Sequence, residues 1–261
     1  MKKQIHTWLF LWALFGMGCD YIKENERLIP ITAENISQKR VFLLEFTDQN
    51  CRNCPNATAE IYQLIERFSD TIVVVSIHSN PLPLPLRTQE GNEYEKFYQA
   101  LDHPVAFVDG GGKYTSHDPQ VWGGFIFERL TAEASVTIEM AVAYDEAVKE
   151  ATIHVQVIGE EVDLTDLNLQ LWIIENNVKH WQLMMDGSRV EDYIHNHVFR
   201  SSVNGTWGEP FSLEAGETKD FYYESALNAA WKVEDVAIVG FVSRQDTNET
   251  LNVQEIKITN I

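Results

Sequence analysis

The sequence predicts an α/β domain followed by an all-β sandwich domain. Between residues 41 and 108, continuous apolar runs alternate with a helical 3,4,7 spacing of apolar residues, which is typical of strand–helix–strand units with a parallel sheet. Beyond Ser135 the pattern changes to alternating apolar and polar residues, which is typical of half-buried strands. We therefore predict one domain at 39–133 and a second at 134–261, and a chain of 261 residues is long enough for both.

The N-terminal segment reads as an export signal that belongs to neither domain. Lys2 and Lys3 precede an apolar run at 7–15, which ends in small residues before Cys19. This run is shorter than the ~20 apolar residues that a membrane-spanning helix needs. A cysteine after a small residue resembles the cleavage box of bacterial lipoproteins. We therefore expect a signal peptide at 1–18 and a lipid on Cys19; a secreted protein without lipid and a single anchor helix are the alternatives.

The expected elements follow in a simple order. Residues 19–38 are polar and show no clear period, so we expect a tether there. The first domain is then expected to contain, in order, a strand at 41–46, a helix at 57–68, a strand at 71–77, a helix at 93–101, a strand at 103–108 and a helix at 120–134. Seven strands are expected in the second domain, at 136–142, 153–157, 167–173, 193–198, 221–224, 236–243 and 251–258.

The charge of the chain excludes one large class of partners. The formal net charge is −19, and loss of Lys2 and Lys3 with the leader makes it −21. Nucleic-acid binding needs a clustered basic surface, whereas the 20 lysines and arginines here are scattered and outnumbered by acids. We expect no nucleic-acid partner and no bound cofactor, and attachment to a membrane would come from the lipid on Cys19.

Cys51 and Cys54 form a Cys-x-x-Cys motif between an expected strand and an expected helix. With Cys19 assigned to the anchor, they are the two cysteines left in a compartment where disulfides persist. A thiol at the first turn of a helix faces unpaired N–H groups and the positive end of the helix dipole, and Arg52 adds positive charge beside it. Cys54 lies one turn further and can attack a mixed disulfide at Cys51. The motif is therefore a candidate for thiol–disulfide exchange.

Two metal sites are the alternatives that the histidines raise. A closed zinc site built on the Cys-x-x-Cys motif would need His78 and His103 as its further ligands. His195 and His197 are two residues apart, so in a strand they would share a face and could share a metal. We favour neither, because the position before a helix suits a dithiol and no third ligand accompanies the second pair. No metal site is predicted.

The surroundings of the motif resemble thioredoxin-like proteins. Glu45 stands six residues before Cys51, where thioredoxins carry a buried carboxylate that exchanges protons with the second cysteine. Pro104 stands where they carry a cis-proline that faces the dithiol. The resemblance implies that Glu45 moves protons and that the His103–Pro104 bond is cis. A buried acid with a structural role is the alternative for Glu45.

The same resemblance implies where a substrate would bind. His103, together with Arg52 and Asn53 between the cysteines, would help to dock an extended thiol substrate against Cys51. Asn50 stands where thioredoxins have tryptophan, and Arg52 and Asn53 stand where they have Gly-Pro. These departures put general reductase activity in doubt.

Three stretches are similar to a family of Bacteroidetes outer-membrane lipoproteins of about 28 kilodaltons. They are VFLLEFTDQNCRNCPNATAEI at 41–61, YIHNHVFRSSVNGTWGEPF at 193–211 and VAIVGFVSRQDTNETLNVQEIKI at 236–258. The resemblance implies a lipidated thioredoxin-like domain followed by an immunoglobulin-like β-sandwich, held at the outer membrane on its periplasmic or cell-surface face. Asp48 stands where this family usually has glycine.

Two functions are compatible with these patterns. The first is thiol–disulfide exchange with thiol or disulfide proteins of the cell envelope. The second is a noncatalytic surface receptor or adhesin that binds a surface ligand through the β-sandwich, with Cys51–Cys54 as a structural disulfide. A disulfide that closes so short a loop restricts the unfolded chain little, so stabilisation alone explains the pair poorly. This argument favours the first function.

Overall fold

The computed structural model describes residues 39–79 and 84–258. The expected signal peptide at 1–18, the lipidation of Cys19 and the tether at 19–38 lie outside these residues. Within the described part of the chain, no helix combines the length and the apolar character that crossing a bilayer requires.

Helices and strands alternate in the first half of the chain, as the apolar spacing predicts. The elements are β1 (Val41–Thr47), α1 (Cys54–Phe68), β2 (Ile72–His78), α2 (Gln89–Tyr98), β3 (Val105–Val108), β4 (Thr115–Ser116) and α3 (Trp122–Leu130), with short 3₁₀ turns at Ser69–Thr71, Gly112–Tyr114 and Pro119–Val121. Helix α2 begins earlier than expected because the hydroxyl of Thr88 caps it, accepting a hydrogen bond from the Gly91 N–H at 2.9 Å. Helix α3 is shorter than the expected 120–134.

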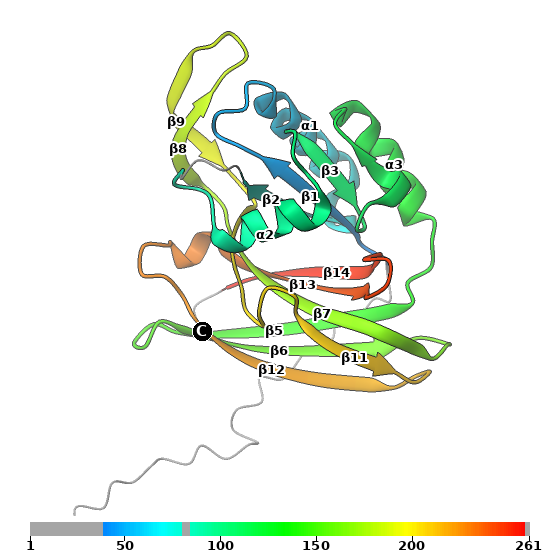
Figure 1. The fold of residues 1–261 in the computed structure, drawn as a ribbon. Helices are drawn as coiled ribbons and strands as arrows, with labels where there is room; N and C mark the ends of the chain where they lie inside the picture. The colour runs from blue at the N-terminus through cyan, green and yellow to red at the C-terminus, as the bar shows by residue number, and fades with distance from the viewer. Residues whose placement is uncertain (1–38, 80–83, 259–261) are drawn as a thin grey trace, which may run out of the picture.

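Strands β1 and β2 are parallel, β3 runs antiparallel to β1, and β4 runs antiparallel to β3. Side chains alternate across the sheet. Val41 and Leu43 face α1 and α3, whereas Phe42 and Phe46 belong to the core on the opposite face. Figure 1 shows α1 and α3 on one side of these strands and α2 on the other. This alternation also decides which face Glu45 occupies.

The second half is built almost entirely of strands. They are β5 (Val136–Asp145), β6 (Glu150–Gly159), β7 (Leu164–Glu175), β8 (Val178–Leu183), β9 (Arg189–His195), β10 (Val198–Ser202), β11 (Glu209–Leu213), β12 (Thr218–Ala226), β13 (Val236–Arg244) and β14 (Thr250–Lys257), with a 3₁₀ turn at Val233–Asp235. The prediction of a single strand at 193–198 is wrong. The chain turns between β9 and β10, where His197 has a left-handed backbone with φ 57°.

One sheet runs through both halves of the molecule. Its strand order is β14-β13-β7-β10-β2-β1-β3-β4, with β11 also paired to β7. Strand β10 joins the halves, because it pairs antiparallel with β7 and, at Val198 opposite Ser76, parallel with β2. A second sheet, β12-β6-β5, packs its apolar side chains against those of β7 and β13. The fold is thus mostly β, and the division at residues 133 and 134 stays a prediction.

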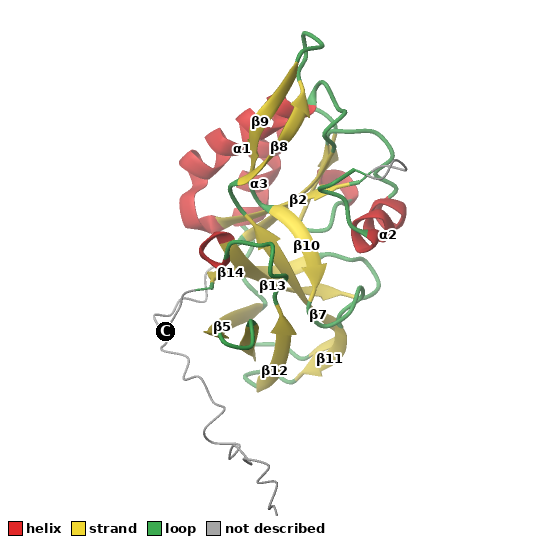
Figure 2. Ribbon diagram, turned by 90° about the vertical axis from the view of Figure 1, so that its left-hand side faces the viewer, coloured by secondary structure: helices red, strands yellow, loops and turns green. Residues whose placement is uncertain are grey.

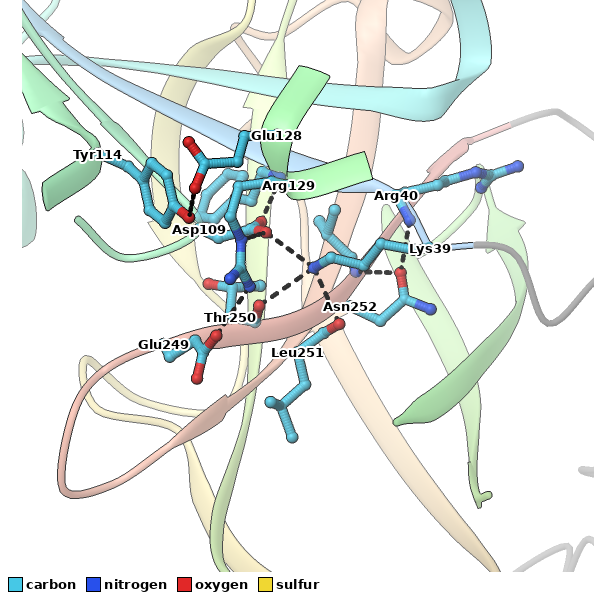
Figure 3. A network of polar contacts seen from close by, with 12 residues as sticks. Lys39, Arg40, Asp109, Tyr114, Glu128, Arg129, Glu249, Thr250, Leu251 and Asn252 are labelled. Carbon is cyan, nitrogen blue, oxygen red and sulfur yellow. Dashed lines mark hydrogen bonds and ion pairs between the residues drawn. The ribbon is translucent and has the colours of Figure 1, made fainter. Parts of the chain in front are cut away.

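A buried polar network also ties the two halves together (Figure 3). Asp109, which follows β3, receives Lys39 Nζ at 2.9 Å and Arg129 Nε at 2.8 Å on the same carboxylate oxygen. Lys39 Nζ also donates to the Leu251 carbonyl at 2.9 Å, and Arg129 pairs with Glu249 at 2.8 Å. Since Glu249 and Leu251 lie at the start of the last strand, the network joins that strand to the first half.

Candidate functional site

The two cysteines lie where the sequence predicts, at the turn from β1 into α1. They form a disulfide, with their Cα atoms 5.4 Å apart. Cys54 is the first residue of α1 and is buried, whereas Cys51 is half-buried. The Cys54 N–H lies 3.1 Å from Cys51 Sγ, and the Cys51 N–H donates to the Asp48 carbonyl at 3.1 Å. An incoming thiolate therefore has access to Cys51 before Cys54.

The His103–Pro104 peptide bond is cis, as the resemblance implies. Pro104 is buried, and the His103 carbonyl oxygen lies 3.5 Å from Cys51 Sγ. Beside the disulfide lies a groove of about 480 Å³, lined by Asn53, Asn56, His103, Pro104, His117, Asp118 and Pro119. The groove brings two of the three expected substrate-binding residues, Asn53 and His103, together next to Cys51.

Arg52 does not line that groove. Its guanidinium lies close to Gly187, in the loop between β8 and β9. The expected role of Arg52 in substrate binding therefore lacks support from its placement. Its positive charge still stands between the two cysteines in the chain, and it is exposed.

Asp48 organises the loop that precedes the motif. Its Oδ1 accepts the Asn50 N–H at 2.8 Å, and its Oδ2 accepts from Arg87 Nε at 3.0 Å. The Asp48 side chain is buried, so the pair with Arg87 compensates for the cost of burying its charge. His103 lies nearby and contacts Glu95 at 3.3 Å. Burial lowers the pKa of His103, and the negative charges of Glu95 and Asp48 oppose that change.

Glu45 is buried on the face of β1 that carries α1, because it shares that face with Leu43. Its Oε2 accepts a hydrogen bond from Ser76 Oγ at 2.7 Å. Burial raises the pKa of Glu45 to about 7, and the bond from Ser76 opposes this rise. The first turn of the helix on the same face carries Cys54. The expected pair of a buried acid and the second cysteine is therefore placed on one side of the sheet.

The hairpin of β8 and β9 lies against the motif, and the sequence does not reveal this contact. Figures 1 and 2 show the hairpin projecting beside α1. Gln182 Nε2 donates to the Cys51 carbonyl at 3.0 Å, and the Leu183 N–H donates to the Gln49 carbonyl at 2.9 Å. In return, Gln49 Nε2 donates to the Trp181 carbonyl at 2.9 Å. Both glutamines are buried, and no pattern of polar residues in the sequence marks them as partners.

His195 and His197 do not share a strand face, because β9 ends at His195 and the chain turns before β10. Both nevertheless line one small cavity, together with His78 and Glu45. In the described ranges, 39–79 and 84–258, no group of three or more histidine, cysteine or acidic side chains is arranged to hold a metal ion. The spacing of His195 and His197 in the sequence indicates the pair, but its proximity to Glu45 depends on the tertiary fold.

The comparison with solved structures shows the same fold in two bacterial proteins, HBP35 and AGR_C_4864. HBP35 of Porphyromonas gingivalis superposes with a TM-score of 0.68 at 17% identity, covering 86% of this chain and 77% of that protein. The protein AGR_C_4864 from Agrobacterium tumefaciens gives a TM-score of 0.54 at 12% identity, covering 87% and 98%. A domain of the outer membrane lipoprotein Omp28 from P. gingivalis is 25% identical over 49% of this chain and 90% of that domain, with a TM-score of 0.37.

A search of curated proteins gave no sequence match. The sequence does match the family described as outer membrane protein Omp28 over residues 91–260, which is more than half of the chain. The matched part begins after Cys54 and covers α2, β3, α3 and the β-rich half. The chain therefore belongs to the Omp28 family and is an outer membrane protein of the kind first expected from its three similar stretches.

Proposed function

We propose that this outer membrane protein carries out thiol–disulfide exchange through Cys51 and Cys54. The observation that carries the proposal is the half-buried Cys51 sulfur, which lies beside a groove lined by Pro104 and His103. The order β4-β3-β1-β2, with the disulfide after β1 and a cis-proline before β3, supports a thioredoxin-like unit at 39–133. The packing of β12-β6-β5 on β7 and β13 supports an immunoglobulin-like sandwich after it.

The proposed reaction transfers two electrons from a dithiol protein of the envelope to the Cys51–Cys54 disulfide. A substrate thiolate attacks Cys51 Sγ, the Cys51–Cys54 bond breaks, and a mixed disulfide forms at Cys51. Cys54 leaves as a thiolate and takes a proton from the neutral carboxyl of Glu45. The second substrate thiolate then attacks the substrate sulfur of the mixed disulfide and releases Cys51. The substrate becomes a disulfide, and the protein becomes a dithiol; the reverse sequence reduces a substrate.

The remaining groups of the site would orient the substrate. Asn53 and His103 line the groove, so they are placed to bind the chain on either side of the substrate cysteine. Lipidation of Cys19 would hold the site close to the outer membrane, where the partners would be envelope proteins with accessible thiols or disulfides. Neither role involves nucleic acid or a cofactor.

The first test is the reduction potential of the Cys51–Cys54 pair, measured by equilibration with glutathione buffers and thiol trapping. We expect a value between about −270 and −120 mV, the range of known exchange proteins. A value below about −300 mV, typical of structural disulfides, would contradict exchange.

Partner trapping provides an independent test. In the reducing direction Cys54 resolves the mixed disulfide at Cys51, so in Cys54→Ser the Cys51 thiolate should attack substrate disulfides and the substrates should accumulate on the protein in cells. Cys51→Ser is the matched control and should accumulate none. Equal trapping by the two variants would mean that Cys51 is not the attacked sulfur.

A noncatalytic receptor or adhesin is the second candidate function. Trp207, in the loop before β11, is half exposed and packs on the exposed ring of Phe97, with ring centroids 4.9 Å apart. Exposed aromatic pairs of this kind occur in binding surfaces. Adhesion that is lost in Trp207→Ala and kept in Cys51→Ser would favour this function over exchange.

A further inference from the structure

A small cavity of about 20 Å³ lies between the β1–β2 part of the sheet, α1 and the end of β9. Its lining includes Glu45 and His78 from the first half of the chain and His195 and His197 from the second. A cavity needs only about 10–15 Å³ of such space to hold one water molecule. The volume therefore fits one water.

Four buried polar atoms in the lining have no hydrogen-bond partner among the described residues. They are Glu45 Oε1, His78 Nδ1, His195 Nε2 and His197 Nδ1. Buried polar atoms without partners are rare in folded proteins, and here four gather in the lining of one cavity. A buried water typically makes two to four hydrogen bonds to such atoms. The cavity is thus a built polar site and not a packing defect.

The backbone holds the four side chains in place. Glu45 and His78 lie on the α1 face of the adjacent strands β1 and β2. Glu45 is paired in register with Ser76, which donates a hydrogen bond to it, and His78 lies two residues further along β2. The His195 ring packs edge-on against His78, with centroids 5.1 Å apart. The His197 N–H donates to Asn176 Oδ1 at 2.8 Å, and its carbonyl accepts the Ser76 N–H at 2.8 Å.

The cavity also has an exit. Its lining includes Tyr62, whose side chain is 44% exposed on α1, and Asn196, whose Nδ2 donates to the Tyr62 hydroxyl at 2.7 Å. Thr58, one turn after Cys54 on α1, lines the same cavity and donates to the Cys54 carbonyl at 3.2 Å. The cavity therefore extends from the helix turn of the buried cysteine to the surface.

We propose that this cavity binds a water molecule that carries the proton between Glu45 and solvent, with His78, His195 and His197 as positioning residues for that water. The inference rests on the proposed thiol–disulfide exchange. Cys54 attacks a mixed disulfide at Cys51, the Cys51–Cys54 bond forms, and the substrate sulfur leaves as a thiolate. The Cys54 proton passes to the Glu45 carboxylate, then to the cavity water, and leaves beside Tyr62.

The electrostatics of the cavity agree with this role. Burial lowers the pKa of His195 and of His197 to about 4 each, so both rings are neutral at pH 7 and can accept a hydrogen bond from water. Burial also lowers the pKa of His78 well below its usual range, and the positive charges of Arg200 and Arg87 act in the same direction. The carboxylate of Glu45, with Ser76 beside it, is thus the group that accepts the proton.

The reaction of the reduced full-length protein with Ellman's reagent separates the two thiols. Cys51 attacks first and releases one thionitrobenzoate; Cys54 then attacks the mixed disulfide and releases the second. We expect His195→Gln and His197→Gln to slow the second release by about tenfold at pH 6 to 7, less than the roughly 10²–10⁴-fold effect of losing a general acid or base itself, because Glu45 is kept. Above about pH 9 the Cys54 thiol ionises without Glu45, so the rates should converge with that of the unaltered protein.

Controls separate the possible failures. His154→Gln replaces a buried histidine of β6, outside the cavity, and should change neither phase. A second phase that is unchanged at pH 6 in the cavity variants, or slowed equally at every pH, overturns the relay while leaving exchange intact. If the unaltered protein shows no first phase, it is the proposed function that fails.

A measurement on the unaltered protein tests the inference even if the histidine variants do not fold. Proton NMR should show nuclear Overhauser contacts between a long-lived water and the ring protons of His195 and His197. Their absence would overturn the inference. So would a tightly held divalent metal found by elemental analysis and lost in His195→Gln, because it would occupy the place of the water.

Discussion

Glu45 shows how burial sets the chemistry of a single residue. Its carboxyl group has one hydrogen-bond partner among the described residues, and burial raises its pKa from 4.5 to about 7. The folded protein therefore binds a proton between pH 4.5 and 7 that the unfolded chain releases. The stability that this proton provides is complete below pH 4.5 and is lost as pH rises through 7.

Glu45→Gln should remove this pH dependence. A shift from 4.5 to about 7 corresponds to about 3 kcal/mol, so the variant should gain about that much unfolding free energy relative to the unaltered protein between pH 4.5 and pH 8. Urea unfolding at the two pH values measures it. A constant difference between the two proteins would mean that folding does not shift the pKa of Glu45.

The contribution of His197 to stability depends on pH in the opposite direction. Burial lowers the pKa of His197 to about 4, so between pH 6.5 and 4 the unfolded chain binds a proton on this ring and the folded protein does not. The stability from the neutral ring is complete above pH 6.5 and is lost as pH falls through 4. His197→Gln should therefore reduce the loss of unfolding free energy between pH 6.5 and 4 by up to about 3 kcal/mol. An acid loss of the same size in His197→Gln and in the unaltered protein would contradict this prediction.

At the scale of elements, the β8–β9 hairpin supports the Cys-x-x-Cys loop. Gln182 Nε2 donates to the carbonyls of Asp48 and Cys51, at 3.3 and 3.0 Å. The hairpin belongs to the second half of the chain, so the loop that carries the dithiol is held from outside the βαβ unit. The hairpin also approaches the motif at Gly187, which lies near the Arg52 guanidinium.

Gln182→Leu should loosen this loop. The substitution leaves the Cys51 carbonyl without its side-chain donor, whereas the Asp48 carbonyl keeps the Cys51 N–H, and the loss costs about 1–3 kcal/mol of unfolding free energy. A loosened loop should also let dithiothreitol reduce the disulfide several times faster, and thiol titration measures this rate. Gln156→Leu, on the exposed part of β6, is the matched control. A variant that loses stability without any change in reduction rate would show that the hairpin does not limit access to Cys51.

At the scale of the whole molecule, the two halves share a core. Phe42 of β1 contacts Trp172 of β7 and Phe241 of β13, with ring centroids 5.8 and 4.8 Å apart. The same apolar cluster contains Phe199 of β10 and residues of α2 and β2. Since this core and the sheet both cross residue 133, folding of either half depends on the other.

We therefore expect one cooperative unfolding transition for residues 39–258, and no stable fold for 39–133 alone. Phe241→Ala, in the second half, should destabilise the first half as well, by about 3–5 kcal/mol. Hydrogen exchange of β1 and β13 amides measures both halves at once. Two separate transitions, or loss of protection confined to β13, would show independent domains.

The sequence by itself determined the order of strands and helices in the first half and the position of Cys51 and Cys54 at a strand-to-helix turn. It did so because apolar periodicity and the Cys-x-x-Cys spacing are local signals. The turn between β9 and β10 carries no glycine or proline to mark it in the sequence, and it is His197 that adopts the left-handed backbone there.

Only the tertiary structure decided what surrounds the dithiol. The pairing of β10 with β2, the contact of Gln182 with Cys51 and the meeting of His195 and His197 with Glu45 join residues more than 100 positions apart. Such contacts are made by single glutamines and histidines, which carry no periodic signal in the sequence. They form because the shared sheet and core bring the two halves together, and their positions follow from that packing.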